Sequence, residues 1–312
     1  MNEATLIIAA WNSAELLPKS IDCALNQSGV RSQVIVADDA STDDTEAVVA
    51  KYSDVLYTRL TQNGGPSAAR NAAIELATTD WIAVLDSDDT IHSDRLRHMI
   101  DLAQRTQADI VLGNFQRVDE DGTLLREPHF LYGADIDPEN ALTLKAYIGQ
   151  NIFDDVALQT GYLKPIFRKS TMDRMGLRYD EKLRNSEDFH IVLRAIALGA
   201  KVVISTDPEY FYTVRTGSIS YHVDTEKLTA LQQADAAFVE EFSSQMDEDA
   251  RRLFARRCRS LIDVTEGERV MGFMKKRQFA RVLGHLLRRP ATVSRVAHQL
   301  MEALGKRLGR HI

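Results

Sequence analysis

The 312-residue sequence has little cysteine and no long hydrophobic run. Its two cysteines, Cys23 and Cys258, are too few for a disulfide framework or a cysteine-ligated zinc site. No stretch approaches the roughly 20 consecutive apolar residues that a membrane-spanning helix needs, and residues 1–4 lack the basic start of a signal peptide. We therefore expect a cytoplasmic protein, with the inner face of the membrane as an alternative location.

Two phosphate-binding motifs are also missing. The fingerprint GxGxxG does not follow the first expected strand, and the loop GxxxxGK[ST] does not occur. These absences argue against nicotinamide-dependent oxidoreduction and against P-loop hydrolysis.

The net charge of −7 is unevenly distributed along the chain. Residues 273–312 carry ten Lys and Arg side chains and one acid, Glu302, so the rest of the chain is strongly acidic. An acidic body excludes a general nucleic-acid-binding surface. Leucines and valines alternate with the basic residues of 275–312, a pattern that fits an amphipathic helix on an anionic membrane. A helical face packed on the body of the protein fits the pattern equally well.

Short apolar runs alternate with helical patterns in the first half of the chain, which predicts an α/β fold with a mostly parallel sheet. Helices are expected near residues 140–149, 169–176 and 187–198, and almost throughout from Thr225 onward. A hairpin is expected at 118–127. Strands are expected at residues 4–10, 33–37, 54–58, 81–85, 109–115, 201–205 and 209–214.

Two of these strands end in acidic clusters, Asp38-Asp39 and Asp86-Ser87-Asp88-Asp89. Ligands of open parallel sheets bind beyond the carboxyl ends of the strands, so both clusters point to the expected site. Crowded carboxylates repel one another, and a divalent cation relieves that repulsion. Oxygen ligands favour Mg²⁺ or Mn²⁺, which points to a nucleotide diphosphate or phosphoryl substrate. Either cluster alone would also suit a turn or a helix cap.

Five segments in order resemble glycosyltransferase family 2: residues 5–28, VIVADDASTDDT at 34–45, NGGPSAARN at 63–71, WIAVLDSDDT at 81–90, and the stretch 161–220 with LKPIFRK and NSEDFHIVLR. The resemblance implies a GT-A fold and transfer of a sugar from a nucleotide donor with inversion. It divides the chain into a GT-A domain at 1–224, with a nucleotide-binding half at 1–115 and an acceptor and catalytic half at 116–224. Residues 225–312 would form a helical C-terminal region with a basic amphipathic tail.

The resemblance also assigns roles to matching residues. Asp188 of the pair Glu187-Asp188 would be the general base that takes a proton from a hydroxyl of a glycan or lipid-linked saccharide. Asp88, with Asp86, would hold Mg²⁺ or Mn²⁺, and His222 is a candidate third ligand. Asp39 would accept the N3–H of uracil, and Trp11 would stack on the base. The residues expected to bind the UDP-sugar are Trp11, Asp39, Asn63, Arg70, Asp86, Ser87, Arg215 and Ser218.

Each residue also has a structural alternative. Glu187 and Asp188 begin an expected helix, where acids favour the macrodipole, and Arg70 and Arg215 could be surface arginines. His222 could be a solvent-facing loop histidine. Two other functions fit parts of the pattern: a catalytically silent subunit that binds or scaffolds sugar nucleotides, and a Mg²⁺-dependent domain phosphorylated on an aspartate.

Overall fold

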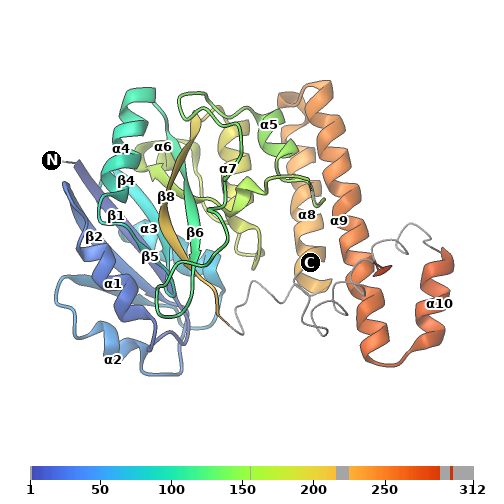
Figure 1. Cartoon of the computed structure of the whole chain (residues 1–312), viewed down its shortest axis with the longest axis horizontal. Coiled ribbons are helices and arrows are strands. Elements are labelled where there is room, and N and C mark those ends of the chain that lie inside the picture. The colour runs from blue at the N-terminus through green and yellow to red at the C-terminus, as the bar shows by residue number, and fades with distance from the viewer. Residues whose placement is uncertain (1, 155, 216–224, 289–295, 298–312) are drawn as a thin grey trace. The chain divides into compact units, whose positions relative to one another are not determined.

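The computed structural model describes residues 2–154, 156–215, 225–288 and 296–297 (Figure 1). The chain forms two compact units. The first comprises residues 1–147 and 160–221, and the second comprises residues 148–159 and 222–312. A sheet with flanking helices makes up the first unit, and the second is helical.

The first unit is built on one eight-stranded sheet in the order β3-β2-β1-β4-β7-β6-β8-β5. Strands β3, β2, β1 and β4 are parallel, whereas β7 runs antiparallel between β4 and β6. Strand β8 is parallel to β6 and antiparallel to β5. The strands are β1 (Asn2–Ala10), β2 (Val30–Asp38), β3 (Val55–Arg59), β4 (Trp81–Asp86), β5 (Thr90–Ile91), β6 (Ile110–Val118), β7 (Lys164–Arg168) and β8 (Val202–Thr213).

Helices cover this sheet because its central strands are apolar on both faces, as parallel strands usually are. The side chains of β1 from Leu6 to Ile8 and of β4 from Ile82 to Leu85 are almost completely buried. Helix α3 packs on β1, β2 and β3, and α4 packs on β6 and β8. The helices of this part of the chain are α1 (Leu17–Leu25), α2 (Thr45–Val49), α3 (Pro66–Leu76), α4 (Arg95–Thr106), α5 (Leu144–Gly149), α6 (Lys169–Met175) and α7 (Glu187–Ala197).

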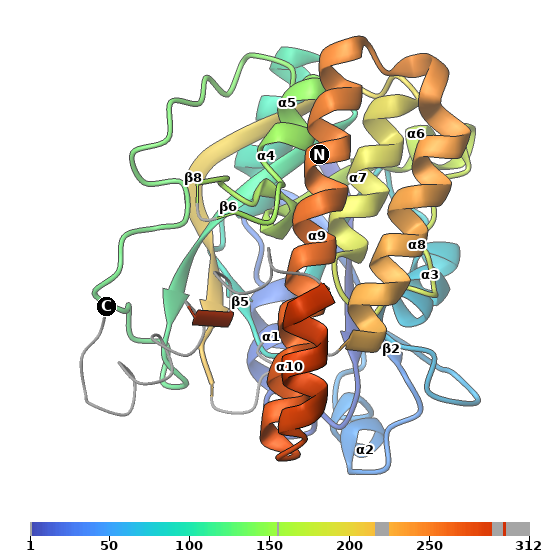
Figure 2. The same cartoon turned by 90° about the vertical axis from the view of Figure 1, so that its right-hand side faces the viewer.

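The second unit contains α8 (Thr225–Phe242), α9 (Glu248–Lys275) and α10 (Phe279–Arg288). Helices α8 and α9 lie side by side in both views (Figure 2), and Arg257 of α9 forms a buried ion pair with Asp235 of α8 at 3.0 Å. Asp247 caps α9, because its side chain accepts the N–H of Ala250 at 2.7 Å. Within the described residues, no helix is both long enough and apolar enough to cross a bilayer.

The predicted α/β class, with a mostly parallel sheet, flanking helices and a helical C-terminal region, is confirmed. Three details differ. The expected hairpin at 118–127 is reduced to a single bridge between Val118 and Leu124. The two strands expected at 201–205 and 209–214 are one strand, β8. Strand β7 was not predicted, because its segment KPIFR is short and begins with a charged residue followed by proline.

A buried arginine fixes the sheet where β6 meets β7. Arg95, at the start of α4, donates to the carbonyl oxygens of Asn114 and Lys164 at 3.4 and 3.0 Å, and its guanidinium lies over the ring of Tyr210. Burial lowers the pKa of Arg95 to about 10. The guanidinium passes so close to Gly113 that a Cβ there would lie 2.2 Å from Nη2. Any side chain at position 113 would therefore force the guanidinium to move.

Replacement Gly113→Ala is expected to destabilise the fold by about 1–3 kcal/mol, because the buried guanidinium must give up its carbonyl partners to make room. Gly272→Ala in α9 is the matched control: nothing lies within 4 Å of the added methyl group, and alanine should stabilise the helix by about 0.5–1 kcal/mol. Urea denaturation of both variants measures the difference. Equal stability changes would contradict the steric role of Gly113.

Candidate active site

Strands β2, β1 and β4 end at one edge of the sheet. Ala10 pairs with Asp38 and Ala9 pairs with Asp86, so the segments that follow these strands leave the sheet side by side. The two acidic clusters are thus separated only by the end of β1. Asp38 is used structurally, since its carboxylate accepts the N–H of Ser41 at 2.9 Å and the hydroxyl of Tyr57 at 2.7 Å.

The carboxylate of Asp39 is held by a glycine turn. The N–H groups of Gly64 and Gly65 donate to Oδ1 and Oδ2 at 2.6 and 2.8 Å, and Gly65 has a φ of 88° that favours glycine. Arg184 donates to the side chain of Asn63, the first residue of the turn, at 2.8 Å. Each Asp39 oxygen retains a second lone pair, so the carboxylate can still accept an N–H from a ligand.

Trp11 and Ser87 follow β1 and β4 at the same edge. Ser87 Oγ lies 3.0 Å from Ser13 Oγ, and Ser41 Oγ accepts the N–H of Asn12 at 2.9 Å. These contacts join the segments after β1, β2 and β4. The side chain of Trp11 is 49% exposed, which leaves its ring available to stack on a planar ligand.

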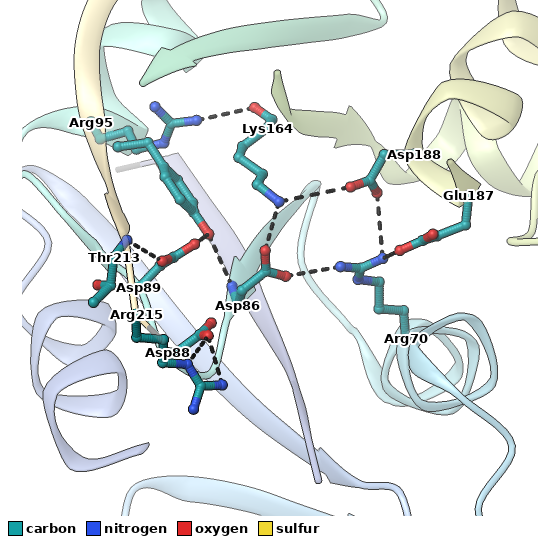
Figure 3. Close-up of polar contacts among 11 residues, drawn as sticks. Arg70, Asp86, Asp88, Asp89, Arg95, Lys164, Glu187, Asp188, Thr213 and Arg215 are labelled. Atoms are coloured by element: carbon teal, nitrogen blue, oxygen red, sulfur yellow. Dashed lines mark hydrogen bonds and ion pairs between the residues drawn. The ribbon is translucent and has the colours of Figure 1, made fainter. Parts of the chain in front are cut away.

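Arg70 and Lys164 bind the same two carboxylates from different sides (Figure 3). Arg70 Nη2 lies 2.8 Å from Asp86 Oδ1, and Nη1 lies 3.5 Å from Asp188 Oδ1. Lys164 Nζ lies 2.6 Å from Asp86 Oδ2 and 3.9 Å from Asp188 Oδ2. We call this closed set of alternating charges, Arg70, Asp86, Lys164 and Asp188, the charge ring. It joins α3, β4, β7 and α7.

Glu187 is attached to the charge ring through Arg70, whose Nη1 lies 2.7 Å from its Oε1. Ser186, directly before it, has a left-handed φ of 62°. Such a backbone is rare for a residue other than glycine. It turns the chain so that the first two side chains of α7 both reach Arg70.

The electrostatics of the charge ring follow from burial and pairing. Burial opposes ionisation of Asp86, but Lys164 and Arg70 outweigh it and hold the pKa of Asp86 well below its ordinary value. Burial likewise opposes the charge of Lys164, yet Asp86 and Asp188 raise the pKa of that ammonium. For Glu187, burial and the nearby Asp188 raise the carboxyl pKa against the attraction of Arg70.

Asp88 lies outside the charge ring and is paired with Arg215. Both Nε and Nη2 of Arg215 lie 3.0 Å from Asp88 Oδ2. Burial and the charge of Asp86 nevertheless raise the pKa of Asp88. The Asp88 carboxylate is therefore less favourable in its ionised form than an ordinary aspartate, despite its pairing with Arg215.

Asp89 fastens this turn to the end of β8. Its Oδ2 accepts the hydroxyl of Tyr210 at 2.7 Å, and its Oδ1 accepts the N–H of Thr213 at 2.8 Å. The same hydroxyl accepts the N–H of Asp86 at 3.1 Å. Burial, followed by Asp88 and Asp86, raises the pKa of Asp89 well above its ordinary value. Asp89 is thus a structural link that sets Arg215 opposite Asp88.

The structure gathers most of the predicted site residues. Arg70 is 4% exposed and is not a surface arginine. Sequence reasoning missed Lys164, although a lysine inside an apolar strand needs an acidic partner once it is buried. Residues in the clustered acids and their cations are Arg70, Asp86, Asp88, Glu187, Asp188 and Arg215, and residues at the neighbouring strand ends and turn are Trp11, Asp39, Asn63 and Ser87. Ser218 and His222 lie outside the described residues.

The chain resembles known proteins along most of its length. A model of "Glycosyl transferase family 2" matches residues 5–174. The succinoglycan biosynthesis protein ExoO of Rhizobium meliloti is 35% identical over 99% of this chain and 88% of its own length. ExoU of the same organism is 29% identical over 93% and 84%. The chain belongs to glycosyl transferase family 2.

Solved glycosyltransferases share the fold. Staphylococcus aureus TarS 1–349 in complex with UDP-GlcNAc superposes with a TM-score of 0.63 and 16% identity, over 100% of this chain and 93% of that chain. The mannosyltransferase PcManGT of Pyrobaculum calidifontis, in complex with GDP-Man and Mn²⁺, gives a TM-score of 0.58 with 16% identity, over 98% and 86%. The GT-A fold predicted from the sequence is confirmed, and the protein is a glycosyltransferase.

Divalent metals are common in GT-A glycosyltransferases, and the donor set of this member fits one. Within the described part of the chain, no three His, Cys, Asp or Glu side chains form a metal-binding group. Mg²⁺ needs only one or two carboxylates plus substrate phosphates. Asp88 is the better candidate, because its partly buried carboxylate is paired with Arg215 through Oδ2, whereas both oxygens of Asp86 are already paired with cations.

Replacement Lys164→Met is expected to destabilise this glycosyltransferase by about 3 kcal/mol, because it leaves buried carboxylates without one of their two cations. Lys169→Met is the matched control: Lys169 Nζ also lies 2.6 Å from a carboxylate, that of Asp173, but the pair is more exposed and contributes only about 0.3–0.5 kcal/mol. Urea denaturation measures both losses. Similar small losses would show that the charge ring does not stabilise the fold.

Proposed function

We propose that this chain is an inverting, metal-assisted glycosyltransferase that moves a sugar from a UDP donor to a hydroxyl of a glycan or lipid-linked saccharide. The charge ring carries the proposal, because it links Asp86, at the nucleotide side, to Asp188, the candidate base. Relatives named for succinoglycan biosynthesis support a polysaccharide acceptor. The TarS complex with UDP-GlcNAc supports a uridine donor.

The nucleotide belongs at the strand ends of the half formed by residues 1–115. Asp39 accepts the N3–H of uracil with the lone pairs that Gly64 and Gly65 leave available. Trp11 stacks on the base with its exposed ring. Asn63 closes the turn over the nucleotide, and Asp86 and Ser87 lie toward the ribose and diphosphate. Residues 116–224 form the acceptor and catalytic half.

The reaction is a single displacement. Asp188 takes the proton of the acceptor hydroxyl while that oxygen attacks the anomeric carbon. The new C–O bond forms on the face opposite the bond to the diphosphate, which breaks and releases UDP, so the configuration inverts. Arg70 and Lys164 each face a different oxygen of Asp188 and fix its orientation. Glu187 assists by holding the same guanidinium.

Asp88, with Asp86 beside it, would hold Mg²⁺ or Mn²⁺, and His222 is a further ligand candidate on sequence grounds. When bound, the cation stabilises the negative charge that develops on the leaving diphosphate. Arg215 lies next to Asp88, and its forked donors suit the same phosphate oxygens. We assign Ser218 to this role from its sequence position.

The variant Asp188→Asn is expected to lose transfer by at least about 100-fold, because the amide cannot take the proton. Affinity for UDP should stay unchanged, since Asp188 is not among the residues that we expect to contact the uracil ring or the diphosphate. A coupled assay of UDP release over a panel of nucleotide sugars measures transfer, and calorimetry measures UDP binding. Full turnover in this variant would remove Asp188 from the mechanism, and UDP binding without turnover by the native protein would favour a silent subunit.

Asp88→Ala is the companion variant in the same calorimetric titration. It should abolish the dependence of UDP binding on Mn²⁺, whereas Asp188→Asn should retain it. Equal UDP affinity of the native protein with Mn²⁺ and with a chelator would contradict the metal assignment.

We further propose a peripheral contact with an anionic membrane through residues 275–312. Phe279, Leu283 and Leu287 are spaced by four residues and therefore share one face of α10, and their side chains are 66%, 62% and 75% exposed. Exposed cations flank this face at 275–277, Arg281 and Arg288. An apolar face bordered by basic residues matches the chemistry of an anionic leaflet.

The native protein is expected to co-float with vesicles that contain phosphatidylglycerol and to remain unbound with pure phosphatidylcholine. Leu283→Glu with Leu287→Glu should abolish flotation, because charged side chains do not enter the acyl region. Leu56→Glu, at an exposed position of β3, is the control and should leave it unchanged. Flotation that survives the α10 substitutions would overturn this contact.

A further inference from the structure

Four aromatic side chains of the first unit gather near the end of β8, and a fifth, Tyr132, lies close to one of them in the sequence. The rings of Phe115 and Phe130 stack with centroids 4.5 Å apart, and Tyr212 lies 5.9 Å from Phe115. Tyr162 meets Phe130 edge-on at 6.5 Å. Tyr132 follows Phe130 by two residues. We call these five residues the aromatic patch.

The aromatic patch is anchored to the sheet by Asn114, whose side chain is fully buried. Its Oδ1 accepts the N–H of Phe115 at 2.8 Å and that of Leu131 at 3.3 Å, and its Nδ2 donates to the carbonyl oxygen of Thr206 at 2.7 Å. The N–H of Phe130 also donates to the carbonyl oxygen of Phe115 at 2.9 Å. The segment that carries Phe130 and Tyr132 is therefore held in place by β6.

The base of the aromatic patch is buried and its rim is open. Phe115 is 6% exposed, whereas Tyr162 and Tyr132 are 55% and 71% exposed. Clusters of exposed apolar side chains typically mark a binding site, and aromatic residues are enriched at recognition surfaces. A tyrosine combines an apolar ring with a polar hydroxyl, so the exposed Tyr132 and Tyr162 suit a ligand that has both apolar and polar groups.

The aromatic patch borders the acid cluster through two strands. Tyr212 and Tyr210 point to the same side of β8 because side chains alternate along a strand, and the Tyr210 hydroxyl contacts both Asp89 and the N–H of Asp86. Tyr162 lies two residues before Lys164, whose ammonium faces Asp188. The patch and the groups that we place in the reaction are therefore carried by the same stretches of chain, at β8 and at the start of β7.

We propose that the aromatic patch binds the acceptor saccharide. A pyranose ring presents C–H groups on its faces and hydroxyls at its edge, so an aromatic face with tyrosine hydroxyls complements both. Charge favours a neutral ligand, because the adjacent Arg117 and Glu127 neutralise each other in an ion pair. The inference rests on the proposed transferase function, and it adds the location and chemistry of the acceptor site.

The test compares glycan binding by exposed-ring variants. The double variant Tyr132→Ala with Tyr162→Ala should bind an array of immobilised pyranose oligosaccharides at least about tenfold more weakly than the native protein, since each stacked ring contributes separately. Tyr132→Phe with Tyr162→Phe keeps the rings and should retain most of the binding. Leu76→Ala is the control, because it removes an exposed apolar side chain from α3 and should bind as the native protein does.

Three outcomes overturn the inference. The double alanine variant could bind glycans as the native protein does, or the native protein could bind no glycan of the array. The third is that the double alanine variant loses binding to phosphatidylglycerol vesicles and not to glycans. Calorimetry with UDP separates this inference from the proposed function. Unchanged UDP affinity in every variant shows that the donor site is intact, so only the acceptor assignment is then at stake. A native protein that fails to bind UDP would instead contradict the proposed function.

Discussion

Arg70 places one guanidinium among three carboxylates, those of the buried Glu187 and Asp188 and of the partly buried Asp86, and the rest of the site depends on that arrangement. Asp86 comes from the end of β4, and Glu187 and Asp188 come from the start of α7. Like charges this close repel one another unless a cation lies between them. Arginine is always ionised, and its donors are fixed in a fork, so a single side chain serves all three acids. Folding and chemistry are therefore coupled, because the residue that joins α3, β4 and α7 also orients the candidate base.

Asp86, at the end of β4, and Asp88, in the turn that follows, differ physically. Asp86 is saturated by Arg70 and Lys164, and its pKa is held low. Asp88 has Arg215 as its ion-pair partner, and burial raises its pKa. A divalent cation would therefore be more favourable at Asp88, whose ion pair with Arg215 uses Oδ2, than at Asp86, where it would have to displace two established pairs. This difference explains how neighbouring carboxylates can serve separate roles.

The sequence predicted the acids at the strand ends better than the contacts of Lys164, for a physical reason. Strands β2 and β4 each end in an apolar run followed by acids and flank β1 in the sheet, so the location of Asp39 and Asp86 at one edge follows from the parallel order. Lys164 was missed because β7 is short, antiparallel and inserted between β4 and β6 from much later in the chain. Its partners are 78 residues away at Asp86 and at the start of α7. The sequence around Lys164 contains no pattern that indicates contacts with residues so far away along the chain.

The backbone before α7 is strained at the point where the chain leads into the ion pairs with Arg70. Ser186 adopts a left-handed φ of 62°, a conformation that costs a residue with a Cβ about 1 kcal/mol or more. Glu187 and Asp188, which directly follow this strained position, both pair with Arg70. An unpaired buried charge costs more than a strained dihedral angle. The strained backbone of Ser186 is therefore retained, because the ion pairs with Arg70 contribute more free energy than the strain costs.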